Sequence, residues 1–238
     1  QIFPESDASG DGMLFMDIDT GKYLQLWYTP DEVEALFNFD RDDKGVLITN
    51  MEGLADVLGI PMTAFDHPGV KIITPRNDNE NFVEGLKNNK TTNVKNLHSI
   101  TLLKLWSHIT GVTIHPIYVT SEANEARADP GSRKAKAAQW TQAIKDWEAK
   151  SGLQASEIEL PAGLRDTSSW TVLPNSENLD MRVRDVYEKL IIILKWHKEK
   201  GQDQHFRVPV DTAVEALEQG LAGLPIKEMD RTRIDYPE

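Results

Sequence analysis

The chain has 238 residues, of which 39% are hydrophobic, and it contains six tryptophans but no cysteine. This composition predicts a globular protein with a proper core and excludes both a disulfide framework and thiolate metal sites. No apolar run is long enough to span a membrane and no signal-peptide pattern is present, so we expect an intracellular protein, in the cytoplasm or nucleus. The net charge of −12 argues against broad binding to polyanions, because affinity for a phosphate backbone comes largely from Lys and Arg.

Three strands are predicted first, at residues 2–7, 13–17 and 23–28. Turn residues at 19–22 join the last two, which indicates an antiparallel meander. Thr29 and Pro30 then favour a helix start, because Thr caps helices and Pro suits the first helical position. A strand-like segment at 45–49 leads into a helix at about 50–58, which would place Glu52 in the first turn of that helix.

The middle of the chain predicts a buried strand at 70–74, a short amphipathic helix around Phe82, a longer helix at 93–109 and a strand at 112–119. Pro116 interrupts the last strand, which indicates an edge strand or a bulge. Beyond residue 134 the pattern changes to helices, expected at 136–150, 179–200 and 210–221. We therefore divide the chain into a first domain, 1–134, and a mainly helical extension of unknown role, 135–238.

Four acidic residues stand in settings that suit a shared site. Asp7 ends the first strand and is followed by small residues and glycines, which permit close approach of the backbone to a phosphate or metal. Glu52 is expected at the start of a helix, Asp78 at the end of the buried strand and Asp129 at the opening of a late helix. The surrounding segments are Ser6-Asp7-Ala8-Ser9, Asn50-Met51-Glu52-Gly53-Leu54-Ala55, Asp78-Asn79 and Ala128-Asp129-Pro130-Gly131-Ser132-Arg133.

This order of elements and acids resembles the ribonuclease H family over residues 1 to about 135, and the four segments are similar to those of reverse-transcribing retroelements. The resemblance implies an α/β ribonuclease H-like fold, with a five-stranded mixed sheet whose first three strands are antiparallel and with flanking helices. It also implies an endonuclease that hydrolyses the RNA strand of RNA–DNA hybrids within a reverse transcriptase polyprotein. The hybrid and the reverse transcriptase domain of that polyprotein would be its partners.

The resemblance further implies two Mg²⁺ ions, with Mn²⁺ as an alternative. Asp7 would bridge both ions, Glu52 and Asp78 would help to hold one, and Asp129 would hold the other. Hard divalent cations prefer carboxylate oxygens, and two of them can activate a water and relieve charge on the leaving oxygen. Acids that hold such cations are neutralised by them, so the formal net charge overstates the field that a nucleic acid meets.

Contacts to the substrate are expected from five further residues near these acids. Neutral hydrogen bonds would read 2′-hydroxyl groups and cationic side chains would contact phosphates. The candidates are Ser9, Asn79, Lys87, Lys90 and Arg133. Turn chemistry is the alternative interpretation of the asparagines in this region. The histidine that many cellular members carry before the last acid is missing from residues 118–128.

Other interpretations remain open at this point. The same fold can serve as a scaffold or binding module with a vestigial acid site, or as a DNA-cutting transposase or resolvase. Residues 17–21 superficially resemble the nucleophile segment of haloacid-dehalogenase phosphatases, but the strand-like pattern after them favours a hairpin turn. Residues 40–45 suggest a calcium-binding loop, but Met51 stands where its last ligand should be Glu, which favours a turn.

Overall fold

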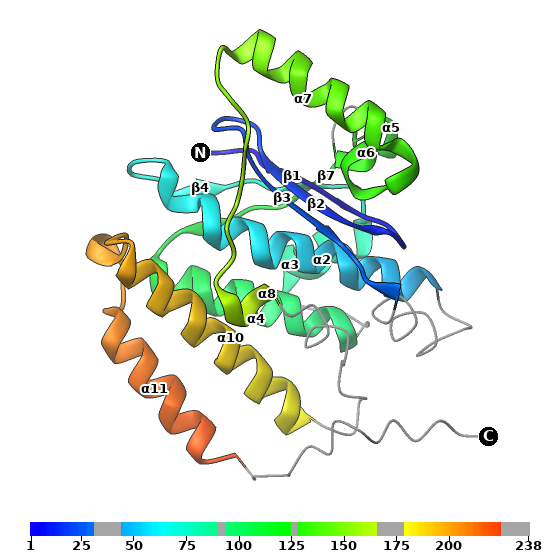
Figure 1. Cartoon of the computed structure of the whole chain (residues 1–238). Helices are drawn as coiled ribbons and strands as arrows, with labels where there is room; N and C mark the ends of the chain where they lie inside the picture. Colours follow the sequence, from blue (N-terminus) through cyan, green and yellow to red (C-terminus); the bar gives the residue numbers. More distant parts are fainter. Residues whose placement is uncertain (31–43, 90–93, 125–127, 166–178, 225–238) are drawn as a thin grey trace, which may run out of the picture.

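A computed structural model of the chain describes residues 1–30, 44–89, 94–124, 128–165 and 179–224 (Figure 1). Its strands are β1 (Glu5–Ala8), β2 (Gly12–Asp17), β3 (Lys22–Trp27), β4 (Ile72–Ile73), β5 (Arg76–Asn77), β6 (Thr113–Ile114), β7 (Ile117–Tyr118) and β8 (Ser156–Glu157). Six of them form one sheet in the order β7-β5-β1-β2-β3-β8, and β4 pairs with β6 beside it. The meander β1-β2-β3 is antiparallel as predicted, and β5, β7 and β8 join in parallel. The α/β class and the mixed sheet are thus confirmed.

The hairpin between β2 and β3 is closed by Asp17. Its carboxylate accepts hydrogen bonds from the backbone N–H of Asp19 at 3.1 Å and from the Thr20 hydroxyl at 2.7 Å. His67 lies 2.5 Å from the same carboxylate, and Gly21 adopts the positive φ of 73° that the turn needs. Asp17 therefore stabilises the hairpin turn that the sequence predicted.

Two prolines interrupt the strands at one edge of the sheet without breaking the ladder. The N–H of His115 donates to Ile73 O at 2.8 Å, and the N–H of Ile117 donates to Pro75 O at 2.9 Å. Pro116 lies between these donors, at the position where an N–H would point away from the neighbouring strand. Strand β7 is an edge strand of the sheet, as Pro116 predicted.

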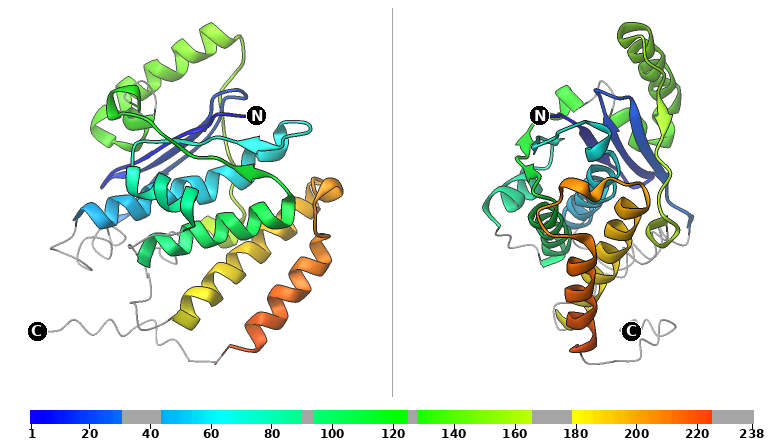
Figure 2. Two further views of the ribbon diagram at one scale, coloured as in Figure 1. Left: turned by 180° about the vertical axis from the view of Figure 1, so that it is seen from behind. Right: turned by 90° about the vertical axis from the view of Figure 1, so that its left-hand side faces the viewer.

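Helices cover both faces of the sheet (Figures 1 and 2). They are α2 (Lys44–Thr63), α3 (Glu80–Asn88), α4 (Val94–Thr110), α5 (Ser121–Asn124), α6 (Ala128–Ser132), α7 (Ala137–Ser151), α8 (Ala162–Arg165), α10 (Leu179–Glu199) and α11 (Val210–Ala222). The described residues also contain the 3₁₀ turns η1 (Ala64–Asp66) after α2, η2 (Lys134–Lys136) between α6 and α7, and η3 (Asp203–His205) between α10 and α11. Helix α2 packs on one face with Met13 and Phe15, whereas α6 and α7 cover the other face with Leu14, Met16 and Trp140.

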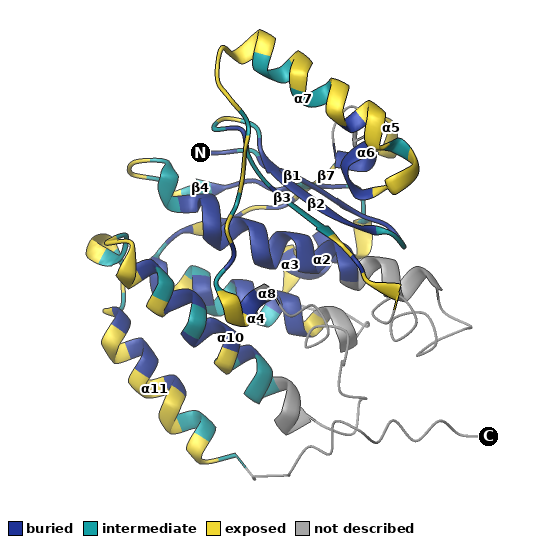
Figure 3. Ribbon diagram, viewed as in Figure 1, coloured by how far each residue is buried: buried dark blue, intermediate teal, exposed yellow. Residues whose placement is uncertain are grey.

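The prediction of a strand-like segment at 45–49 is wrong, because α2 already begins at Lys44. A short apolar run reads alike as a buried strand or as part of a buried helix. Here the helix lies between the sheet and α4, and its residues 51–63 are all buried (Figure 3). Glu52 consequently stands eight residues after Lys44 rather than in the first turn. The helix predicted from Thr29 and the segment 40–45 fall largely on residues 31–43, outside the described residues.

The region after residue 134 shares the sheet and the core with the region before it. β8 pairs with β3, so the sheet has six strands where five were predicted. Helix α10 packs on α4 and α8, and α11 packs on α10. Trp106 of α4 donates its ring N–H to Nε2 of His197 in α10 at 3.1 Å, with both side chains buried. The apolar stripe of α10, through Val186, Leu190 and Leu194, is therefore part of the main core.

None of the helices in the described part of the chain is long and apolar enough to cross a lipid bilayer.

Candidate metal centre

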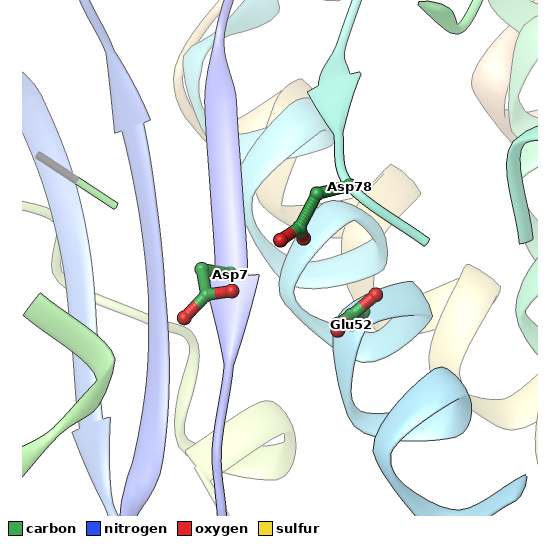
Figure 4. Close-up of side chains that lie close together, drawn as sticks. All are labelled: Asp7, Glu52 and Asp78. Carbon is green, nitrogen blue, oxygen red and sulfur yellow. The ribbon is translucent and has the colours of Figure 1, made fainter. Parts of the chain in front are cut away.

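Three of the four predicted acids converge. Asp7 of β1, Glu52 of α2 and Asp78, which directly follows β5, each offer an oxygen within 4.8 Å of the others (Figure 4). Asp7 and Glu52 are buried, and Asp78 is half-buried. Because β1 and β5 are parallel neighbours with Glu5 opposite Arg76, the residues two positions further on in each chain segment lie side by side. The topology thus explains how residues 71 positions apart meet.

The third acid, Glu52, lies near Asp7 and Asp78 because α2 packs closely against α3. A Cβ at Gly53, next to Glu52, would lie 2.8 Å from the ring of Phe82 in α3. Only glycine leaves room for that ring at this position. The contact places α2 against α3, whose first residue, Glu80, follows Asp78 by two positions.

Two of the three carboxyl groups, those of Glu52 and Asp7, lie in an environment that disfavours their charge. Burial raises the pKa of Glu52 to about 9, and the neighbouring carboxyl groups of Asp78 and Asp7 add to the rise. Burial likewise raises the pKa of Asp7 to about 7, although a hydrogen bond from Ser132 acts in the opposite direction. Among the described residues, Oε2 of Glu52 and Oδ1 of Asp78 have no hydrogen-bond partner. Three close carboxyl groups with two unpartnered oxygens fit a hard divalent cation, which would supply the missing positive charge.

Asp129 is not part of this group of three oxygens. It lies in α6, where its carboxylate forms ion pairs with Lys136 and with Arg133, whose Nε is 2.6 Å from Oδ1. Burial acts to raise the pKa of Asp129, but hydrogen bonds from Lys136 and Arg133 hold it below its ordinary value. The charge of Asp129 still raises the pKa of Asp7, so the two acids are electrostatic neighbours. Ser132 connects them, because its hydroxyl is hydrogen-bonded to Asp7 and lies 3.1 Å from the backbone oxygen of Asp129.

Chemically, the site is built from oxygen donors alone. No protein-family model, curated protein or solved structure matches the chain. Carboxylate oxygens without histidine or cysteine favour Mg²⁺ or Mn²⁺ over softer transition metals.

The predicted substrate contacts have different surroundings. Ser9 is buried and donates to the backbone oxygen of Ser132 at 2.5 Å, so its hydroxyl links the segment after β1 to the end of α6. Asn79 caps α3 by accepting the N–H of Phe82 at 3.1 Å, which is turn chemistry, but it also lowers the pKa of Glu52 and so borders the acids.

The cationic candidates divide in a similar way. Arg133 lies beside Asp129, with a side chain that is 45% exposed. Lys87 is exposed and pairs with Glu84 of its own helix. Lys90 lies outside the described residues. Of the two cationic candidates within the described residues, Arg133 lies beside the acids and Lys87 pairs within its own helix.

Sequence reasoning missed two side chains close to the acids. Asp56 lies one turn after Glu52 in α2 and is fully buried. The signal was an acid four residues after Glu52 in an otherwise apolar helix, a spacing that puts both on one helix face. Lys136 is the second of these side chains, and its ion pair with Asp129 depends on the turn η2 between α6 and α7, which no local pattern predicts.

Proposed function

We propose that the chain is a divalent-cation-dependent endonuclease that hydrolyses the RNA strand of RNA–DNA hybrids, as a module of a reverse-transcribing element's polyprotein. The observation that supports this best is the convergence of Asp7, Glu52 and Asp78, with two of their oxygens lacking a hydrogen-bond partner among the described residues. Cleavage of a phosphodiester needs concentrated positive charge and a nucleophilic water. A cluster of acids can provide both only by holding cations.

Asp7, Glu52 and Asp78 would hold the first cation. When bound, Mg²⁺ or Mn²⁺ supplies Lewis acidity and a water of lowered pKa. The carboxyl groups must lose their protons to ligate, and the raised pKa of Glu52 means that protons and cations compete for this residue around neutral pH.

Arg133 and Lys136 would act in two arrangements, one paired with Asp129 and one turned toward the substrate. In their present arrangement they neutralise its carboxylate, and they bring two positive charges beside the acids of a chain whose net charge is −12. A second cation at Asp129 requires that these side chains move away. Both are only partly buried, so they are free to turn toward a phosphate of the substrate.

The preference for a hybrid follows from the resemblance noted in the sequence, and two features of the site support it. Asn79 offers a neutral amide beside Glu52, which suits a 2′-hydroxyl. Arg133 offers a guanidinium at the rim, which suits a phosphate. The net charge of −12 agrees with a short duplex footprint better than with a long one.

The test is a cleavage assay with labelled RNA–DNA hybrid, RNA duplex and DNA duplex, each with Mg²⁺ or with EDTA. We expect Mg²⁺-dependent cuts confined to the RNA strand of the hybrid. Asp78→Asn should abolish them, because it removes a charge from the cation site at nearly constant volume. Asp17→Asn is the matched control, a buried aspartate at the hairpin end of β2, and should remain active.

Each other result has a defined meaning. Full activity of a folded Asp78→Asn protein would refute the assignment of the site. Cutting of the DNA duplex would instead favour a transposase or resolvase, and no cutting by folded protein would favour a vestigial module.

A further inference from the structure

Three fully buried polar residues, Ser6, Asp56 and Asn77, lie close in the chain to the three acids and form a buried polar layer. Its most unusual member is Asp56, which has no exposed surface and is flanked in α2 by the fully buried Ala55 and Val57. Burial raises the pKa of Asp56 to about 7, while the Ser6 hydroxyl acts to lower it. Neither oxygen of Asp56 has a partner at ordinary hydrogen-bond distance among the described residues. Such a group is costly in a core, so its presence calls for a function.

Ser6 connects this carboxyl group to the strand that precedes Asp78. Nδ2 of Asn77 donates to Oγ of Ser6 at 3.1 Å, and both residues are fully buried. Oδ1 of Asn77 in turn accepts the backbone N–H of Asn79 at 2.7 Å. The two asparagines therefore fix the backbone on both sides of Asp78.

The layer is linked to helix α2 at two positions. A side-chain hydrogen bond from Asn79 lowers the pKa of Glu52, and Asp56 lies one turn after Glu52 in α2. Ser6 immediately precedes Asp7 in β1, and successive strand side chains point to opposite faces of the sheet. Ser6 therefore faces α2, on the side where β1 and β2 otherwise present the apolar Ala8 and Phe15 to the core.

From these contacts we propose that Asp56, Ser6 and Asn77 are positioning residues that hold Asp7 and Asp78 in place for a divalent cation. Asp56 lies in the helix that carries Glu52 and is coupled electrostatically to the Ser6 hydroxyl, so the layer links β1, β5 and α2 beside their three acids. This role rests on the proposed function only in taking the acids as the cation site. None of the three residues contacts the substrate in this proposal.

The test measures Mn²⁺ affinity by calorimetry on the whole chain, independently of any cleavage. Asp56→Leu should weaken Mn²⁺ binding about 10- to 100-fold, the range typical for partners of metal-ligating side chains. Asp56→Asn keeps a polar group of the same size and should stay within about threefold of the unmodified chain, well under that range. Asp17→Asn, which alters a buried aspartate at the hairpin end of β2, should leave Mn²⁺ affinity unchanged.

Ser6→Ala and Asn77→Ala extend the test in case Asp56→Leu does not fold. Weaker Mn²⁺ binding by either folded variant supports the layer. Mn²⁺ binding of normal strength by all folded variants would overturn it, and so would equal losses in Asp56→Asn and Asp56→Leu. Glu52→Gln must also bind Mn²⁺ more weakly, since otherwise the acids are not the cation site and the layer has nothing to position. A chain that binds Mn²⁺ as expected but cuts no hybrid would refute the proposed function and leave the positioning role standing.

Discussion

Glu52→Gln should make the cation-free protein more stable at neutral and basic pH, although it removes a residue of the site. The pKa of Glu52 rises from 4.5 in the unfolded chain to about 9 in the folded one. Between these values the folded state binds the proton that the unfolded state releases, so stability falls as pH rises. Each pH unit in that window costs about 1.4 kcal/mol for one group. From pH 5 to pH 8 this amounts to at most about 4 kcal/mol, a penalty that glutamine does not carry.

The assay is urea unfolding of both proteins in EDTA at pH 5 and pH 8. At pH 5 the two should have similar free energies of unfolding, and at pH 8 the glutamine protein should be the more stable one. Adding Mn²⁺ at pH 8 should then stabilise the unmodified chain and leave Glu52→Gln little changed, because a ligand stabilises only the state that binds it. Parallel pH profiles of the two proteins in EDTA would refute the reasoning, since Glu52 would then carry no penalty.

Two further changes test other parts of the structure. Lys136→Met removes one counter-charge from Asp129, so we expect tighter binding of a second Mn²⁺ ion by calorimetry, and an unchanged titration curve would show that Lys136 does not compete with the cation. Trp106→Phe leaves Nε2 of the buried His197 without its donor and should lower the free energy of unfolding by about 1–3 kcal/mol in urea. A loss well below that range would mean that the hydrogen bond contributes little between α4 and α10.

The sequence predicted the parts of the site that depend on local patterns. Asp7 lies at the end of the predicted strand 2–7, whereas Asp78 follows β5 (Arg76–Asn77), which lies beyond the predicted strand at 70–74. Parallel pairing of β1 with β5 brings the two acids together. The meander was equally readable, because Gly21 and its polar neighbours are typical of a hairpin turn. Glu52 was assigned to the correct helix but to the wrong turn, because residues 45–49 carry no feature that separates a strand from a buried helix.

Features that depend on distant partners could not be read in this way. β8 has two residues, and nothing local marks Ser156 and Glu157 as a strand that pairs with Lys22 and Tyr23. The burial of Asp56 likewise follows only from the packing of α2 on the sheet. Interactions over such separations are decided by the whole fold, and a single sequence shows them only when both partners carry a recognisable motif.

The regions before and after residue 134 share one hydrophobic core, and this has a thermodynamic consequence. Trp106 and His197 meet in its interior, and the apolar face of α10 completes the covering of α4. Units that share a core tend to unfold together, so the helices at the end of the chain and the strands at its beginning are expected to lose structure in one transition. A cation bound at Asp7 would then slow the opening of α10 as well, and any molecule that loosens α10 would weaken the acid site from the opposite side of the protein.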